Sequence, residues 1–425
     1  MSATVLGPAS PKARADRRHR WKVLAVGVAA NASFAAAFSG LPTTAVFMRA
    51  AYDLNNALLG LVLGLLGLGI ALSELPWGLL TDRWGDRRVL LLGLGTTALA
   101  LAMMALVAAP SPGAAPPRGL LAAGMLLVGL LGGSVNGSSG RAVMAWFREG
   151  ERGLAMSIRQ TALPAGGGLG ALVLPPLAAT HGFAVVFGGL AGLCALATLA
   201  AARWLGEPPV EAAAAGDPSM AGSGPLRSTA IWRVATGIGL LCVPQLAVLT
   251  FGAIFLHDFA GVGVAVTSGA LVVVQVGAGI LRVWSGHWTD RRRNRRAYLR
   301  GCALASAGLF LSLGLLTATL GPAAWWWSVS LLTFGGVIAS AWNGIAFTEL
   351  ASLAGAARAG TALALGNSFA FLTLFLTPLA IPVLLAWSAW PTVWIAAAGS
   401  ALAASAVFPP QAFPGAVSRD RGARP

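Results

Sequence analysis

The stretch Glu74-Leu-Pro-Trp-Gly-Leu-Leu-Thr-Asp-Arg-Trp-Gly-Asp-Arg-Arg88 decides the fold, because its key residues recur once in the chain. One glycine, one aspartate and three arginines return 208 residues later, with no gap between the copies. Each copy ends a long apolar run and opens a short basic turn. An internal repeat of this length predicts two similar halves joined head to tail. The repeated residues are Gly78, Asp82, Arg83, Arg87 and Arg88 in the first copy, and Gly286, Asp290, Arg291, Arg295 and Arg296 in the second.

The composition indicates that these halves lie in a membrane. The 425 residues are 56% hydrophobic and 10% charged, with a mean hydropathy of +0.75, whereas soluble proteins carry about 25% charged residues. Apolar runs of roughly 20 residues with few charges are typical of transmembrane helices. The net charge of +15 lies in short loops between these runs, so it does not indicate binding to nucleic acid. The sequence predicts an all-α integral membrane protein whose surroundings are the lipid bilayer.

No pattern in the chain predicts an enzyme. Cys194, Cys242 and Cys302 lie inside apolar runs and are placed for neither a disulfide nor a metal site. The sequence contains no nucleotide-binding loop and no nucleophile constellation. We therefore expect no catalytic residue, no cofactor and no metal, and we expect a monomer.

The distribution of basic residues orients the helices. The even-numbered connections and both tails carry arginine or lysine, whereas the odd-numbered connections carry only Arg49 and Arg118. Basic loops stay on the cytoplasmic side, so we expect a protein of the inner membrane with both termini in the cytoplasm. The expected segments are a basic tail over 1–22, a six-helix half over 23–205, a linker over 206–228, a second half over 229–408 and a tail over 409–425.

The repeated stretch has a direct physical interpretation. Gly78 removes a side chain, so that a neighbouring helix can approach closely. Asp82 follows one turn later, at the membrane edge, where it can meet a helix N-terminus or an arginine. The arginines hold the loop on the cytoplasmic side. We expect structural and gating roles, rather than substrate contact, for Gly78, Asp82, Arg83, Gly85, Arg87, Arg88, Gly286, Asp290, Arg291, Arg295 and Arg296.

The spacing Gly-x-x-x-Asp-Arg-x-Gly-x-Arg-Arg, from Gly78 to Arg88, resembles the signature between helices 2 and 3 of the major facilitator superfamily. The resemblance implies twelve transmembrane helices in two six-helix halves related by a pseudo-twofold axis. Arg293 stands where Gly85 stood, so the second copy departs from the signature at its tight turn.

Four ionisable residues lie inside the predicted helices, where charge is costly and marks a candidate functional site. They are Glu74, Arg141, Arg159 and Arg282. Glu74 and Arg282 are equivalent in the repeat, each eight residues, or about 12 Å, before the motif aspartate. One interpretation is an ion pair that locks the halves together. The other is that Arg282 binds substrate and Glu74 carries a coupling proton, because apolar surroundings favour a protonated carboxyl and a nearby arginine favours an ionised one.

Other polar residues in the apolar runs have two open interpretations. Arg141 and Arg159 are expected either to pair with an acid at the cytoplasmic gate (Asp82, Glu149 or Glu151) or to attract anions toward the cavity. Glu349 is expected at the gate. Asparagine and glutamine side chains inside helices either serve helix packing or bind substrate. The candidates for substrate hydrogen bonds are Asn31, Asn136, Gln245, Asn343 and Asn367.

The tract Arg282-Val-Trp-Ser-Gly286 resembles helix 8 of the monocarboxylate transporters, and the oxalate/formate exchanger looks similar in using a helix-8 arginine. The resemblance implies that Arg282 binds a substrate carboxylate. Monocarboxylate transporters carry an acid one turn earlier, where this chain has Ala278. The predicted function is secondary transport of a small organic anion by alternating access, with proton coupling left open. The alternatives are a multidrug/proton antiporter, suggested by the glycine-rich segment Gly166 to Gly170, and a non-transporting membrane sensor.

Overall fold

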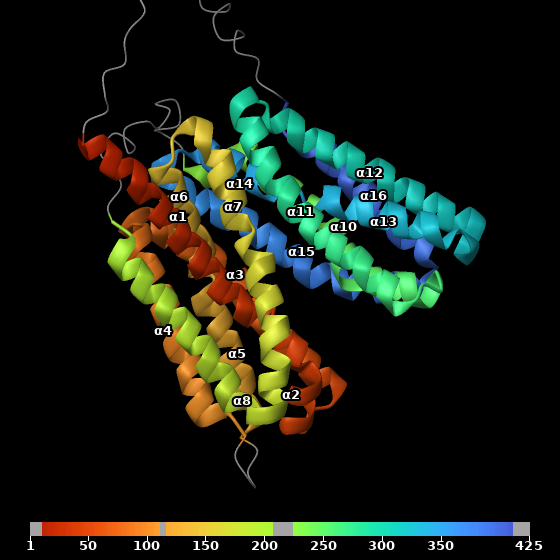
Figure 1. Ribbon diagram of the computed structural model, residues 1–425, viewed down its shortest axis with the longest axis horizontal. Coiled ribbons are helices and arrows are strands. Elements are labelled where there is room, and N and C mark those ends of the chain that lie inside the picture. Colours follow the sequence, from red (N-terminus) through yellow and green to blue (C-terminus); the bar gives the residue numbers. More distant parts are fainter. Residues whose placement is uncertain (1–10, 111–115, 207–223, 411–425) are drawn as a thin grey trace, which may run out of the picture.

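The computed structural model describes residues 11–110, 116–206 and 224–410, and the regular structure within these ranges is helical (Figure 1). The predicted linker and tails lie largely outside them: residues 1–10, 207–223 and 411–425 are not described, whereas residues 11–22 form the beginning of the first helix. The helices of the first half are α1 (Pro11–Phe38), η1 (Leu41–Thr44), α2 (Ala45–Ala51), α3 (Asn56–Trp84), α4 (Asp86–Met103), η2 (Met104–Ala108), α5 (Arg118–Gly132), α6 (Ser134–Trp146), η3 (Glu149–Glu151), α7 (Arg152–Gln160) and α8 (Ala162–Trp204).

The second half repeats this order of elements, with a broken fourth span in both halves. In the first half the break lies between α5 and α6, and in the second it lies between α13 and α14. The helices of the second half are η5 (Pro225–Arg227), α10 (Thr229–Ile254), η6 (Phe255–Phe259), α11 (Val264–Arg292), α12 (Arg295–Leu320), η7 (Gly321–Ala324), α13 (Trp325–Ala339), α14 (Asn343–Ala354), η8 (Ala356–Arg358), α15 (Ala359–Trp387) and α16 (Trp390–Val407).

Helix length gives the number of membrane crossings. Ten of the described helical segments are long and apolar enough to span a membrane. Two of them, Glu149–Trp204 and Arg295–Ala354, contain 56 and 60 residues, more than twice the roughly 20 that one crossing needs. Each turns back at a glycine with positive φ, Gly182 (75°) or Gly321 (58°), a conformation that glycine adopts without steric cost. The described chain therefore crosses twelve times, and the predicted all-α fold of two six-helix halves is confirmed.

The side chains are distributed as a bilayer requires. Large apolar side chains are exposed along the spans, for example Leu106 (79% exposed), Leu172 (75%) and Trp387 (88%). Charged residues such as Glu74 and Arg159 are instead buried between helices. Water would disfavour so much apolar surface, whereas lipid tails are as apolar as the side chains they cover. The protein is a multi-pass membrane protein.

The two halves meet at one end of the molecule, which we call the basic end. It is formed by the α3–α4 and α11–α12 connections, which carry Arg83 and Arg291. Here α15 packs along α3 and α6 of the first half, and α7 packs against α11 and α14 of the second. The ribbons of the halves diverge away from this end (Figure 1). Both copies of the repeated stretch therefore lie on the same side of the protein.

The two repeated connections turn differently. Gly85 joins α3 directly to α4 with a φ of 88°. In the second copy Arg293 itself adopts the left-handed conformation, with a φ of 52°, and Asn294 adds a residue before α12 begins. The second copy, with Arg293 where the first has Gly85, therefore has a longer turn but keeps the positive φ that glycine usually supplies.

Candidate functional site

Asp82 binds the beginning of a helix from the opposite half. Its two carboxylate oxygens accept hydrogen bonds from the backbone N–H groups of Gly360 and Thr361, at 2.8 Å each, in the first turn of α15. The first N–H groups of a helix have no partner within the helix, and they carry the positive end of its dipole. The expectation that Asp82 meets a helix N-terminus is confirmed.

Asp290 makes the equivalent contact in the other direction. From α11 it accepts hydrogen bonds from the N–H groups of Gly153 (3.0 Å) and Leu154 (2.9 Å), at the beginning of α7. The residues bound by the two aspartates are 207 positions apart, one fewer than the 208 of the repeat, so these partners are equivalent in the two halves to within one residue. In each of these two contacts, therefore, a carboxylate of one half binds the N-terminus of a helix of the other half.

The motif glycines permit these contacts. A Cβ atom on Gly78 would overlap the Cβ of Ala364 in α15. A Cβ on Gly286 would lie 2.5 Å from Ser157 Oγ and 2.6 Å from the carbonyl oxygen of Gly153 in α7. Both helix pairs cross between the halves, so the prediction that Gly78 allows close approach is confirmed, and it extends to the second copy.

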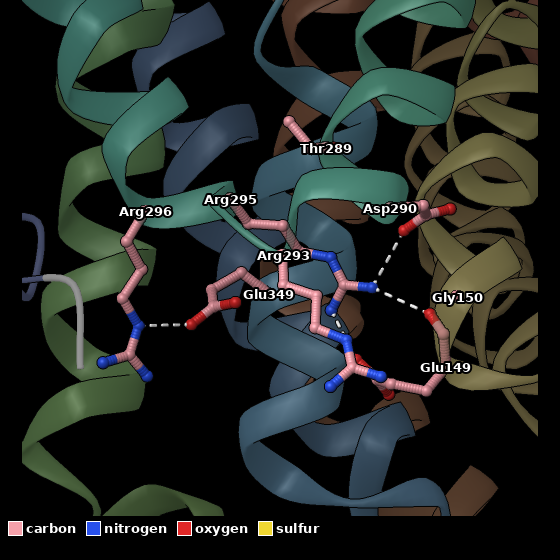
Figure 2. A pocket seen from close by; sticks show the side chains of 8 residues that line it. All are labelled: Glu149, Gly150, Thr289, Asp290, Arg293, Arg295, Arg296 and Glu349. Atoms are coloured by element: carbon pink, nitrogen blue, oxygen red, sulfur yellow. Dashed lines mark hydrogen bonds and ion pairs between the residues drawn. The ribbon is translucent and has the colours of Figure 1, made fainter. Parts of the chain in front are cut away.

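A charged pocket of about 390 Å³ lies beside the Asp290 contact (Figure 2). Arg295 stands at its centre and donates to Glu149 Oε1 of the first half at 2.8 Å and to Asp290 Oδ1 at 3.0 Å. On the other side of the pocket, Arg296 Nε donates to Glu349 Oε1 at 2.6 Å. The pocket is thus part of the contact between the halves at the basic end.

The remaining arginines of the basic end include the half-buried Arg141 and several exposed side chains. Arg141 of α6 donates to Asp86 Oδ1 at 2.9 Å and lies 3.6 Å from Asp82 Oδ1. One expected partner, Asp82, is therefore found, and Asp86 was not anticipated. The motif arginines Arg83, Arg87, Arg88 and Arg291 are among the exposed arginines at this end.

Glu74 is buried in the middle of α3, at 0% exposure. Asn136 of α6 donates its side-chain amide to Glu74 Oε1 at 2.6 Å. Arg159 of α7 attracts the carboxylate electrostatically, and the amide of Asn367 in α15 also faces it. The predicted alternative of an ion pair with Arg282 is wrong: the cation beside Glu74 belongs to the same half.

Arg159 is held by neutral groups. Its Nη2 donates to the carbonyl oxygen of Asn136 (2.6 Å), to Ser139 Oγ (2.9 Å) and to Asn31 Oδ1 (3.3 Å). Its Nε also donates to Ser139 Oγ, at 3.1 Å. The alternative of pairing with an acid at the gate is therefore wrong for Arg159, because its partners lie deeper, on α1 and α6.

Arg282 lies between the halves and is 6% exposed. Its Nε donates to the carbonyl oxygen of Ser340 at 2.5 Å, and its Nη1 donates to the carbonyl oxygen of Gln160, in the first half, at 3.5 Å. Among the described residues, no carboxylate oxygen lies within 4.0 Å of a guanidinium nitrogen of Arg282, and its Nη2 has no protein acceptor. Arg282 is therefore a buried cation with no counter-ion in the part of the chain that the structure describes.

Two predicted amides lie beside Arg282. Asn343 donates to Gln245 Oε1 at 3.4 Å and to the carbonyl oxygen of Ser340 at 3.2 Å, the same oxygen that accepts from Arg282. The other three candidates, Asn31, Asn136 and Asn367, surround Glu74 and Arg159 instead. The structure thus divides the seven predicted substrate-binding residues into two neighbouring groups.

Sequence reasoning missed several partners. Ser139 contributes the oxygen that two nitrogens of Arg159 share, and no sequence signal distinguishes it from a packing serine. The glycines in the first turns of α7 and α15, Gly153 and Gly360, could have been found, because they are 207 positions apart and each is followed, two residues later, by alanine.

A family model for the Major Facilitator Superfamily matches residues 24–378. The chain belongs to the major facilitator superfamily. An uncharacterized MFS-type transporter of Mycobacterium tuberculosis strain H37Rv is 30% identical over 401 residues, which are 93% of this chain and 86% of the relative. Because the family consists of transporters, the protein is a transporter and not an enzyme.

Solved structures of the same fold include three transporters. The proton:xylose symporter XylE has a TM-score of 0.73 at 16% identity, and the match covers 92% of this chain and 95% of the XylE chain. The Escherichia coli fucose:proton symporter FucP has a TM-score of 0.66 at 16% identity, covering 91% and 97%. The human organic anion transporter MFSD10 has a TM-score of 0.69 at 16% identity, covering 94% and 100%. At this identity the similarity concerns the fold alone.

Proposed function

We propose that this member of the superfamily is a secondary transporter that moves a small organic anion across the cytoplasmic membrane by alternating access. The observation that carries the proposal is Arg282, a buried cation between the halves with no carboxylate partner among the described residues. A buried charge without a counter-ion is strongly destabilising, and in a membrane such residues mark substrate pathways. An anionic substrate would supply the missing counter-ion.

The arrangement around Arg282 suits a carboxylate. A planar guanidinium binds a carboxylate through two parallel hydrogen bonds, which a lysine ammonium cannot reproduce. Nη2 is free for such a ligand, and the amides of Gln245 and Asn343 lie near enough to orient its other polar groups. Because Nη1 reaches Gln160 of the first half, a substrate at Arg282 would lie beside residues of both halves.

The basic end is the gate in this proposal, and we place it, with both termini, on the cytoplasmic side because of its arginines. The protein would then be closed toward the cytoplasm in the described state. The contacts that close it are hydrogen bonds from helix termini to Asp82 and Asp290, together with the ion pair of Arg295 and Glu149. Their separation would open Arg282 to the cytoplasm.

Glu74 is the proposed coupling site. Glu74 is a carboxyl group in the middle of the helix bundle, and its contacts to Asn136 and Arg159 lie in the first half. It can therefore gain or lose a proton while Arg282 holds the substrate in the second half. Glu74→Gln should abolish accumulation driven by a pH gradient and leave substrate exchange running. If exchange and accumulation fall together, Glu74 is a structural partner of Arg159 instead.

A multidrug/proton antiporter fits the core less well. Such a protein would be expected to have an acidic, aromatic-rich cavity, whereas Arg159 and Arg282 outnumber Glu74 here. The sugar symporters among the structural neighbours bind uncharged substrates, which would leave Arg282 without a counter-ion. A sensor without transport would show no uptake of any solute.

Uptake by reconstituted vesicles tests the proposal. A panel of carboxylates and neutral sugars should give uptake of at least one carboxylate, and Arg282→Lys should lose most of it while still reaching the membrane. Arg233→Lys is the matched control, because Arg233 also donates to a backbone carbonyl, that of Val407, and should keep uptake. Wild-type uptake by Arg282→Lys, or uptake of sugars alone, would overturn the proposal.

A further inference from the structure

Three charged residues occupy the middle of the described spans. Glu74, Arg159 and Arg282 are 0%, 2% and 6% exposed, and the other charged residues of these spans lie nearer to the helix ends. With Glu74 ionised, the three residues carry one net positive charge. When Glu74 is protonated, they carry two.

Glu74 and Arg159 balance each other through one shared residue. Asn136 donates its side-chain amide to Glu74 and accepts from Arg159 with its backbone carbonyl. The groups that face Glu74 from the packed helices are Asn136 on α6, Arg159 on α7 and Asn367 on α15, and Arg159 is the charged one. A proton on Glu74 therefore removes the charge that balances Arg159.

The two arginines are connected through consecutive residues. Gln160, whose carbonyl oxygen accepts from Arg282, directly follows Arg159 in α7. Each guanidinium has one terminal nitrogen without a protein hydrogen bond, Nη1 of Arg159 and Nη2 of Arg282, among the contacts of the described residues. A ligand with two negative groups would be able to place one charge at each arginine.

Charge neutrality in a low-dielectric core decides how many negative charges fit. An uncompensated buried charge is strongly destabilising. A monoanion at Arg282 neutralises the core only while Glu74 is ionised, so it needs no proton. If a proton enters on Glu74, neutrality requires two negative charges on the substrate.

We infer that the substrate is a dianion with two separated carboxylates, carried together with one proton. Arg282 binds one carboxylate, and Arg159 binds the second once Glu74 takes up the proton. This inference rests on the proposed function, since it assumes an anion at Arg282. No covalent bond changes: the proton binds a carboxylate oxygen of Glu74 when substrate loads, and it leaves when substrate is released and Arg159 attracts Glu74 again.

Binding to the purified full-length protein in lipid nanodiscs tests the inference. The probes are fumarate and monomethyl fumarate, a dianion and a monoanion of the same skeleton, both ionised between about pH 6 and pH 8. Fumarate affinity should rise by about tenfold or more as the pH falls, because its binding is linked to one proton, and monomethyl fumarate affinity should stay level. Glu74→Gln should bind fumarate at the higher pH as tightly as the wild type does at the lower pH.

Further variants separate the role of Arg159 from a loss of folding. Arg159→Gln, which removes one positive charge, should lose the preference for fumarate and keep the binding of monomethyl fumarate, which also shows that it is folded. Glu151→Gln is the control, because Glu151 pairs with Arg20 at the basic end and should leave the pH dependence unchanged.

Each outcome decides a different question. If neither probe nor any other carboxylate binds, the proposed function fails and the inference falls with it. If the monoanion and the dianion bind equally at both pH values, the proposed function stands and the dianion inference is overturned. It is also overturned if Glu74→Gln keeps the pH dependence of the wild type.

Discussion

Replacing Asp290 by asparagine should open the basic end of the protein. Asparagine has the same shape, so it keeps one oxygen that can accept from the N–H of either Gly153 or Leu154. Its amide nitrogen faces the second N–H, and two donors cannot bond to each other. Arg295 loses one charged partner but keeps Glu149.

The magnitude follows from the two hydrogen bonds that Asp290 accepts from the beginning of α7. A hydrogen bond to a charged group contributes about 1.5–3 kcal/mol, and a neutral one about 1 kcal/mol. Removing one charged hydrogen bond and converting the other to a neutral one weakens the closed state by about 3 kcal/mol. At 1.4 kcal/mol for each factor of ten, the ratio of closed to open molecules should fall by about 100-fold.

Spin labels on the two sides of this contact measure the change. Cysteines replacing the exposed Arg148 and Arg291 would carry the labels, in a background where Cys194, Cys242 and Cys302 are replaced by alanine. Pulsed electron–electron double resonance should show a short distance in the parent protein and a longer one in the Asp290→Asn variant.

The matched control lies at the opposite end of the molecule. Asp53 forms an exposed ion pair with Arg118, and Asp53→Asn should leave the distance distribution unchanged, because exposed ion pairs contribute little. An unchanged distribution in Asp290→Asn itself would refute the idea that the carboxylate holds the halves together.

Two further predictions concern packing. Gly286→Ala should destabilise the closed basic end by about 1–3 kcal/mol, because its Cβ would lie 2.5 Å from Ser157 Oγ; the same labels should report more open molecules, whereas Gly279→Ala on the same helix, with no atom within 4 Å, should behave as the parent. Trp394→Ala should lower the free energy of unfolding by about 3–5 kcal/mol, since Trp394 is fully buried among aromatic rings. Trp387→Ala should change it little, because that side chain is 88% exposed; equal unfolding midpoints in detergent for the two tryptophan variants would contradict the packing assigned to Trp394.

The sequence by itself determined the architecture. Apolar runs must form helices in lipid, because each backbone polar group needs a partner within its own segment. The repeat of Gly78 and Asp82 as Gly286 and Asp290 then predicted equivalent helix crossings in the two halves, and these are found. Such features depend on local composition and on spacing along the chain, which are both visible in one dimension.

Only the tertiary structure decided which charges meet. Glu74 and Arg282 are equivalent in the repeat, which suggested a pair, but equivalence under a pseudo-twofold axis places them on different halves rather than in contact. The rotation of α3 and α7 about their own axes brings Glu74 to Asn136 and Arg159 instead, and it leaves Arg282 with backbone carbonyls. These rotations result from the packing of all neighbouring helices, which no local stretch of sequence specifies.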